Sequence, residues 1–202
     1  MLIPNPLIID NHAFDIGVYV LITSIDPLII YRWKKDIHLR FCSQPYEPFD
    51  TQNLLKFNCA LNSKDPSEMP SFEKLVTDFQ FSNFDILNYQ LSNQDHDPER
   101  LWEEIDEAIA SVTLMKSKSI TRYLEIQNKI TGNQTGRAFE LLRYDFVVDA
   151  KLKPHLLEIN MSPNFIFKGV DRERNQMMAK QLLVNTLKIV GAGSYSELME
   201  GR

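Results

Sequence analysis

Cysteine and long apolar segments are both scarce in this sequence. Its 202 residues include two cysteines, Cys42 and Cys59, which are too few for a disulfide framework and match no metal-binding spacing. We therefore expect both to be small core hydrophobic residues in a reducing compartment. The longest apolar stretch, residues 17–31, is interrupted by Asp26 and Pro27, so we expect no membrane span.

Excess positive charge is also absent. The net charge of −5 gives no bulk attraction to nucleic acid or to an anionic membrane, and neither is expected as a partner. The first residues lack the charged region and cleavage site of a signal peptide, which favours a cytoplasmic protein. No P-loop or Gly-x-Gly-x-x-Gly motif is present to cradle phosphates. With 44% hydrophobic residues, the chain is long enough for one substantial domain.

The first part of the chain is rich in β-forming residues. Residues 14–23, 28–33 and 37–42 read as strands separated by turns, and we expect them to form an antiparallel meander. Residues 43–97 contain many Pro, Asn, Asp and Ser residues, which predicts an irregular, loop-rich segment with one helix near 72–79.

Two helices and a hairpin are expected in the second part. Asp97 and Pro98 mark the start of a helix that runs to about residue 130 and ends at Gly132. Strands at residues 138–149 and 155–160 follow. A last helix covers residues 171–190, with Met178, Leu182 and Leu183 on its apolar side and Gly191 as its end. This order predicts an α+β fold with helices against a mostly antiparallel sheet.

The hairpin carries the strongest chemical signal. Side chains alternate along a strand, so Glu158 and Asn160 share one face. A loop at residues 150–153 sets Asp145 opposite Glu158 and Arg143 opposite Asn160. Opposed carboxylates repel, and oxygen ligands of this kind suit Mg²⁺ and the phosphates that it carries. The alternative is a hairpin with one solvated face, on which Arg143 neutralises ordinary surface carboxylates.

Four stretches occur together in the order and spacing of one protein family: residues 3–31, 39–46, 86–91 and 139–165. They resemble the C-terminal half of the tubulin tyrosine ligase-like enzymes, which have an ATP-grasp fold and join an amino acid, usually glutamate, to tubulin. The resemblance covers roughly residues 3–190. It implies that residues 1–202 are a single partial domain, an ATP-grasp-like C-terminal subdomain, and that the N-terminal part is missing.

The resemblance also implies a site. ATP and Mg²⁺ are the expected cofactors, and Asp145, Glu158 and Asn160 carry over as the residues that bind metal and nucleotide. Arg40 matches an arginine expected near the phosphates and is, with Glu158, a predicted catalytic residue. Asn88 carries over as a further cofactor-binding residue.

The implied activity is tubulin polyglutamylation. It is an ATP- and Mg²⁺-dependent ligation of glutamate to tubulin through an acyl phosphate, in which Mg²⁺ and arginines stabilise the phosphoryl transfer. Such an enzyme would be cytoplasmic and associated with microtubules, including those of cilia.

Several positions depart from the family pattern. Gly17 stands where an Asp-Ile-Arg motif has arginine, Asp85 and Leu87 replace a histidine and a threonine, and Asn93 replaces a lysine. These changes remove cations and a hydroxyl from the amino-acid end of the site. They leave open the alternative of an inactive or truncated relative that binds nucleotide or microtubules.

Two basic stretches are candidate contacts for an acidic tubulin tail. They are the run at residues 32–35 and a group beside the last helix, Lys168, Arg172 and Arg174. The alternative is that each is a solvated surface.

Overall fold

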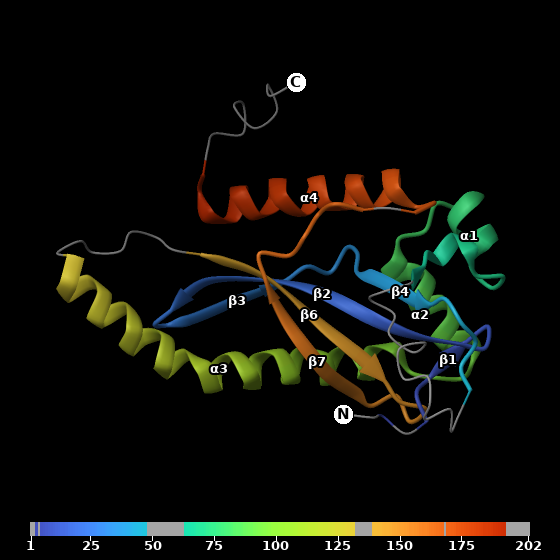
Figure 1. Cartoon of the computed structure of the whole chain (residues 1–202), viewed down its shortest axis with the longest axis horizontal. Helices are drawn as coiled ribbons and strands as arrows, with labels where there is room; N and C mark the ends of the chain where they lie inside the picture. Colours follow the sequence, from blue (N-terminus) through green and yellow to red (C-terminus); the bar gives the residue numbers. More distant parts are fainter. Residues whose placement is uncertain (1–2, 4, 48–62, 132–138, 168, 193–202) are drawn as a thin grey trace.

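The molecule is built around one sheet with a long helix on each face. The computed structural model describes residues 3, 5–47, 63–131, 139–167 and 169–192. Within them, helix α3 (Pro98–Thr131) lies along one face of a seven-stranded sheet and helix α4 (Arg172–Val190) along the other (Figure 1). The short helices α1 (Glu73–Thr77) and α2 (Asn83–Asn93) lie near one end of the sheet. The predicted α+β fold is confirmed.

Strand β2 (His12–Ile25) organises the sheet. Strand β6 (Glu140–Val148) pairs with one edge of it, and β7 (Pro154–Met161) continues the sheet beyond β6. Its other edge takes β3 (Leu28–Arg32) and β4 (His38–Cys42) one after the other. The predicted meander is therefore wrong in its pairing, because the 14-residue β2 is long enough for both five-residue strands to pair with it.

Two short strands complete the sheet. Strand β1 (Ile8–Ile9) pairs with the start of β2, and β5 (Ser63–Lys64) pairs with β4. Every pairing between the described strands is antiparallel.

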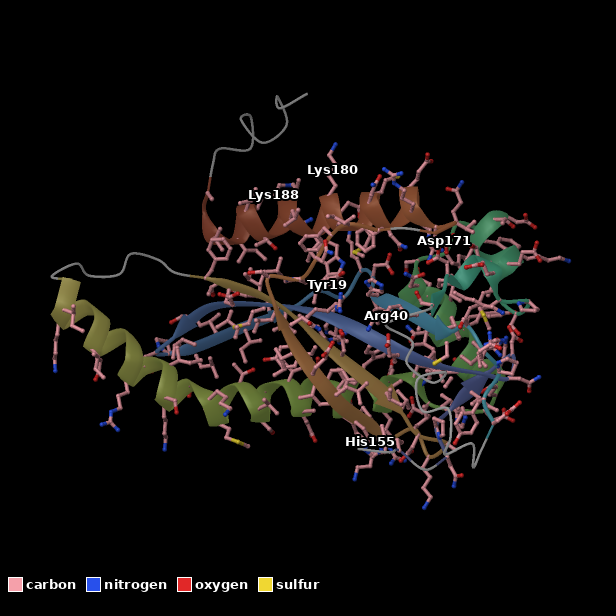
Figure 2. All side chains as sticks on the ribbon, in the orientation of Figure 1. Tyr19, Arg40, His155, Asp171, Lys180 and Lys188 are labelled. Carbon is pink, nitrogen blue, oxygen red and sulfur yellow. The ribbon has the colours of Figure 1, made fainter. Side chains whose placement is uncertain are left out.

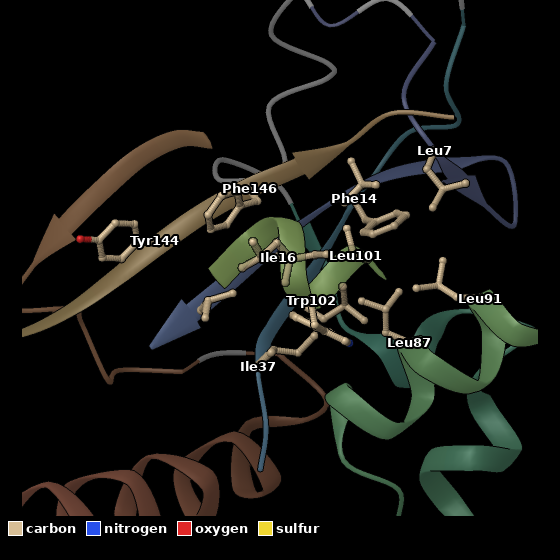
Figure 3. Packing of buried hydrophobic residues seen from close by; sticks show 14 of the residues in the cluster. Leu7, Phe14, Ile16, Ile37, Leu87, Leu91, Leu101, Trp102, Tyr144 and Phe146 are labelled. Carbon is tan, nitrogen blue, oxygen red and sulfur yellow. The ribbon is translucent and has the colours of Figure 1, made fainter. Parts of the chain in front are cut away.

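Alternation along β2 separates two kinds of surface. Its even-numbered residues from Phe14 to Ile22 are buried in the main core with residues of β4, β6, α2 and α3 (Figure 3). The odd-numbered residues face α4, where a smaller cluster surrounds Tyr19 with Phe167, Met178 and Leu182. Asp15 and Tyr19 are thus directed to the α4 side of the sheet.

The helix ends follow the expected capping chemistry. The Asp97 carboxylate accepts the backbone N–H of Glu99 at 3.0 Å at the start of α3. Gly191 ends α4 with a φ of 72°, which favours glycine. Met178 and Leu182 of α4 are buried as predicted, whereas Leu183 is 39% exposed because it turns away from the sheet. Among the described residues, no helix is both long and apolar enough to cross a membrane.

Helix α2 was not predicted. It lies within the segment expected to be loop-rich, and Ser82 caps it by accepting the backbone N–H of Asp85 at 3.1 Å. Ile86, Leu87 and Leu91 bury its apolar side in the main core. Tertiary packing therefore stabilises a helix that its own composition does not favour.

Cys42 corrects one expectation. It is buried, as predicted for a small hydrophobic residue, but it is disulfide-bonded. The other cysteine of the sequence, Cys59, lies outside the described residues. A small number of cysteines rules out a framework of bridges but not a single bond, which depends on distances that spacing does not give.

Helix α3 offers a matched test of the core. Ile105→Ala removes a fully buried side chain that packs against the sheet, and we expect it to lower the free energy of unfolding by about 2–5 kcal/mol. Ile130→Ala on the same helix, at a side chain that is 73% exposed, should change it by less than about 0.5 kcal/mol. Urea unfolding measures both. Equal losses would contradict the assignment of the buried face.

Candidate functional site

Charged side chains gather on the face of the sheet that is turned to α4. They come from four strands: Asp15 from β2, Arg40 from β4, Arg143 and Asp145 from β6, and Glu158 and Asn160 from β7. Tyr19 lies in the same layer, between the sheet and α4 (Figure 2). The site is thus assembled by strand pairing rather than by one contiguous motif.

The register of the hairpin is the predicted one. Asp145 pairs with Glu158 and Arg143 with Asn160. A shift in register follows directly after Asp145, so that Phe146 pairs with Leu156. The two carboxylates and the amide therefore share one face, while Tyr144 of the opposite face packs in the main core.

Asp145 is the centre of the cluster. Its side chain is 1% exposed, and its Oδ1 and Oδ2 accept Nε and Nη2 of Arg143 at 2.7 and 2.8 Å. Its Oδ2 also accepts Nη2 of Arg40 at 3.3 Å and Nδ2 of Asn160 at 3.0 Å. A buried carboxylate is costly unless it is paired and hydrogen-bonded, and here two guanidinium groups and an amide compensate it.

Arg40 connects this carboxylate with a second one. Its Nε and Nη2 bond Oδ1 and Oδ2 of Asp15 at 2.7 and 3.0 Å. Burial raises the pKa of Asp15 to about 6, against the opposing effect of Arg40, so that Asp15 is charged at neutral pH. Arg40, which the sequence predicted to lie near the phosphates, is therefore held by two carboxylates.

Gly17 explains how the cluster accommodates Arg143. A Cβ on Gly17 would lie 2.8 Å from Cδ of Arg143 and 3.0 Å from Cβ of His38. The place of a side chain at residue 17 is thus taken by an arginine from the neighbouring strand. The family pattern has an arginine at residue 17 of β2, and this chain has glycine there. In the structure, the side chain of Arg143 lies against Gly17.

Aromatic rings line the cluster on the α4 side. Phe165 stacks on Tyr19 with ring centroids 5.9 Å apart, and Phe167 lies 5.6 Å from the ring of His38. Burial and the nearby arginines lower the pKa of His38 to about 3, while burial raises the pKa of Tyr19 to about 12. The imidazole is therefore neutral and the phenol protonated at neutral pH. The Tyr19 hydroxyl and Nδ1 of His38 make no hydrogen bond of good geometry with the described residues.

The oxygen donors suit a hard cation such as Mg²⁺. Within the described part of the chain, no three His, Cys, Asp or Glu side chains are placed to hold a metal ion, so a metal here needs Asn160 as its third ligand. Nδ2 of Asn160 donates to Asp145 Oδ2 at 3.0 Å and to Glu158 Oε1 at 3.1 Å, so the amide lies between the two carboxylates, and its Oδ1 is the atom that would bind a metal. Glu158 is exposed and Asp145 Oδ1 accepts one bond from the described residues, so both retain acceptor capacity. The residues present therefore fit a bound Mg²⁺ ion.

The structure does not bring Asn88 to this cluster. Asn88 Oδ1 accepts Nε1 of Trp102 at 2.7 Å, which joins α2 to α3 on the side of the main core. Two of the departures also have local roles, since Asp85 accepts the Ser82 hydroxyl at 2.6 Å and Leu87 is buried in that core. Asn93 is exposed at the end of α2.

Some of the cations in the two predicted basic patches form contacts within the protein. Arg32 pairs with Asp106 of α3 at 2.5 Å and lies over the ring of Trp102. Arg174 donates to the Phe81 carbonyl at 3.3 Å and to the side chain of Asn83. Lys34, Lys35 and Arg172 are exposed, and Lys168 lies outside the described residues. The exposed cations of each stretch remain candidate contacts for an acidic peptide.

Sequence reasoning did not assign Asp15, Tyr19 and His38 to the site. Period-two alternation along β2 places Asp15, Gly17 and Tyr19 on one face, and that signal was available. His38 joins the site through its pairing with Gly17, a contact between strands that alternation alone does not reveal.

Comparison with known proteins gives a consistent result. Residues 2–197 match the model of the tubulin-tyrosine ligase family. The chain is 33% identical over 189 residues to the probable tubulin polyglutamylase ttll-15 of Caenorhabditis elegans, which covers 94% of this chain and 36% of that protein. It is 34% identical to tubulin polyglutamylase TTLL13 of Mus musculus, in an alignment that covers 85% of this chain and 22% of that protein. It is 31% identical to tubulin polyglutamylase ttll6 of Danio rerio, with 94% of this chain and 24% of that protein covered. The chain therefore spans about a third or less of the length of these relatives.

The buried imidazole of His38 gives a pH prediction. Its pKa of about 3 lies below the ordinary 6.5, so the unfolded chain binds the proton first as the pH falls and stability is lost below about pH 6.5. His38→Phe should remove this loss, which amounts to at most about 2 kcal/mol between pH 6.5 and 5.

Urea unfolding of both proteins at pH 7.5 and pH 5 measures the effect. Asp15 and Asp36 have raised pKa values and act in the opposite direction, but they titrate in both proteins. The difference between native protein and variant therefore isolates His38. A variant that loses as much stability on acidification as the native protein would contradict a buried neutral imidazole.

Proposed function

Because the chain belongs to the tubulin-tyrosine ligase family, we propose that it forms the metal- and phosphate-binding part of an ATP- and Mg²⁺-dependent ligase that joins glutamate to tubulin. The observation that carries the proposal is the arrangement around Asp145, where Glu158, Asn160 and Arg40 converge. The names of the relatives, all tubulin polyglutamylases, support the choice of tubulin as acceptor.

The proposed reaction forms an amide through an acyl phosphate. A carboxylate of the acceptor attacks the γ-phosphorus of ATP and ADP leaves. The amine of glutamate then attacks the acyl carbon, a C–N bond forms and inorganic phosphate leaves. Phosphoryl transfer of this kind depends mainly on position and on charge stabilisation, and it needs no covalent protein nucleophile.

Each residue of the cluster has a role in this proposal. Asp145, Glu158 and Asn160 would hold Mg²⁺, which when bound neutralises phosphate oxygens. Arg40, fixed by Asp15 and Asp145, directs a guanidinium to the phosphates without losing side-chain entropy on binding. The aromatic rings of Phe165 and Phe167 cover the α4 side and reduce the access of water.

The departures at Asp85 and Leu87 do not touch this cluster. Asp85 caps α2 and Leu87 fills the main core, so the two substitutions leave the proposed metal and phosphate groups intact. This favours an enzyme over a relative that has lost its chemistry.

The far end of α3 is the surface that best suits an acidic tubulin tail. Lys116, Lys118, Arg122 and Lys129 are exposed there, and Glu125 is the one acidic residue from position 114 to 131. This gives the segment a net charge of +3 (four cations and one anion) in a chain whose net charge is −5. Such a local basic surface attracts an acidic peptide.

Nucleotide binding by the whole chain tests the site. We expect MgATP to bind the native protein and Glu158→Gln to weaken that binding by about tenfold or more, since the variant removes a charged metal ligand. Glu140→Gln changes another exposed glutamate on the same hairpin and should leave the affinity unchanged. Isothermal titration calorimetry measures all three. Equal affinity in native protein and Glu158→Gln would refute the metal assignment.

Co-sedimentation with microtubules tests the basic end of α3. Lys116→Gln/Lys118→Gln should weaken binding several-fold at low salt and have little effect at high salt, where exposed charges are screened. Lys151→Gln/Lys153→Gln removes the same charge from the exposed turn of the hairpin and serves as the control. Identical binding by the two variants would exclude α3 as the docking surface.

A further inference from the structure

Steric contact, rather than backbone conformation, explains why residue 17 is a glycine. Its φ is not in the positive range that favours glycine, because it lies in the regular pairing of β2 with β4 and β6. A larger residue would meet two side chains, since a Cβ would lie 2.8 Å from Cδ and 3.1 Å from Nε of Arg143 and 3.0 Å from Cβ of His38. The glycine therefore makes room for the arginine.

Arg143 has donors to spare. A guanidinium carries five N–H donors, and the bonds of Arg143 to described residues use two of them, both on Asp145. Its side chain is largely buried, with 8% of the residue exposed. A desolvated guanidinium with unused donors is a strong site for an oxyanion.

The neighbours of Arg143 also have unused polar groups. Tyr19 pairs with Arg143 across the strands and is fully buried, and its hydroxyl interacts with the Arg143 guanidinium without a hydrogen bond of good geometry. His38 pairs with Gly17, and its buried Nδ1 has no hydrogen-bond partner among the described residues. A buried polar atom without a partner is costly, and its presence points to a ligand that supplies the missing bond.

Arg143 reduces the negative charge that a bound anion would meet in the cluster. The cluster holds three carboxylates, Asp15, Asp145 and Glu158, against two guanidinium groups, so its net charge is −1. Without Arg143 it would be −2. Repulsion of a polyphosphate at close range would then increase.

We propose that Arg143, passing over Gly17 from β6, binds the phosphate chain of the nucleotide and takes the place that a side chain of residue 17 would otherwise hold. The proposal rests on the proposed function, because it assigns a further residue to the same site. Arg143 is then a substrate-binding residue as well as the counterion of Asp145.

An exchange of the two residues tests this. Calorimetry with MgATP is carried out on the whole chain for the native protein, Arg143→Gly, Gly17→Arg and the double variant Gly17→Arg/Arg143→Gly. We expect Arg143→Gly to weaken MgATP binding by about tenfold or more, as for the loss of a charge-assisted contact. The double variant, which returns a guanidinium from β2, should recover most of the affinity. Arg100→Gly, at an exposed arginine of α3, should bind as the native protein does.

Thermal unfolding without ligand provides a second readout. Gly17→Arg alone should lower the melting temperature, because its side chain meets Arg143, and the double variant should recover it. This pattern tests the shared space independently of nucleotide binding. Gly17→Arg with an unchanged melting temperature would overturn the steric part of the proposal.

The remaining outcomes separate the two proposals. No binding of MgATP by the native chain overturns the proposed function and the role of Arg143 with it. Native binding that Arg143→Gly leaves unchanged overturns the role of Arg143 alone and reduces it to a counterion. A double variant that recovers the melting temperature but not the affinity shows that residues 17 and 143 are not interchangeable.

Discussion

The burial of the Asp145 carboxylate is the constraint on which the rest of the site depends. A charge that is almost fully withdrawn from water is stable only if donors from several directions meet it. Those donors come from three strands, Arg40 on β4, Arg143 on β6 and Asn160 on β7, so the sheet must pair in one register for the site to form. Arg40 in turn holds Asp15 of β2. Strand order and site chemistry are therefore determined together.

The parts that sequence could predict are those governed by local rules. Alternation and loop length gave the hairpin register, and capping residues gave the start of α3 and the end of α4, whereas the predicted end of α3 at Gly132 lies outside the described residues. The pairing of β3 and β4 with the same edge of β2 was missed because β2 is longer than the strand that the sequence predicted. Helix α2 was missed because buried contacts, not composition, stabilise it. The contact of Arg143 with Gly17 joins residues far apart in the chain, and neither residue has a local pattern that reveals it.

The departures from the family pattern divide into two kinds when they are placed in space. Those at residues 85 and 87 belong to α2, where Asp85 serves the cap and Leu87 packs in the main core. The one at Gly17 lies within the cluster, and an arginine from the next strand occupies the space beside it. A substitution that seems to remove a functional group from one strand is thus accompanied by a similar group on its neighbour. Comparing single positions in sequence overlooks such exchanges, because the functional unit is a location on the sheet.

Helix α3 is slightly longer than the longest strand of the sheet that it covers. Its 34 residues span about 51 Å, whereas the 14 residues of β2 span about 46 Å. Beyond Ser117 its described apolar side chains, Ile120, Ile126 and Ile130, are at least one-third exposed. A helical segment whose described apolar side chains are largely exposed gains little stability from packing, so we expect this end to unfold locally more readily than the buried part of α3. A partner that captures the end must hold it in helical form. Part of the binding free energy is then spent on ordering, which makes such a contact readily reversible.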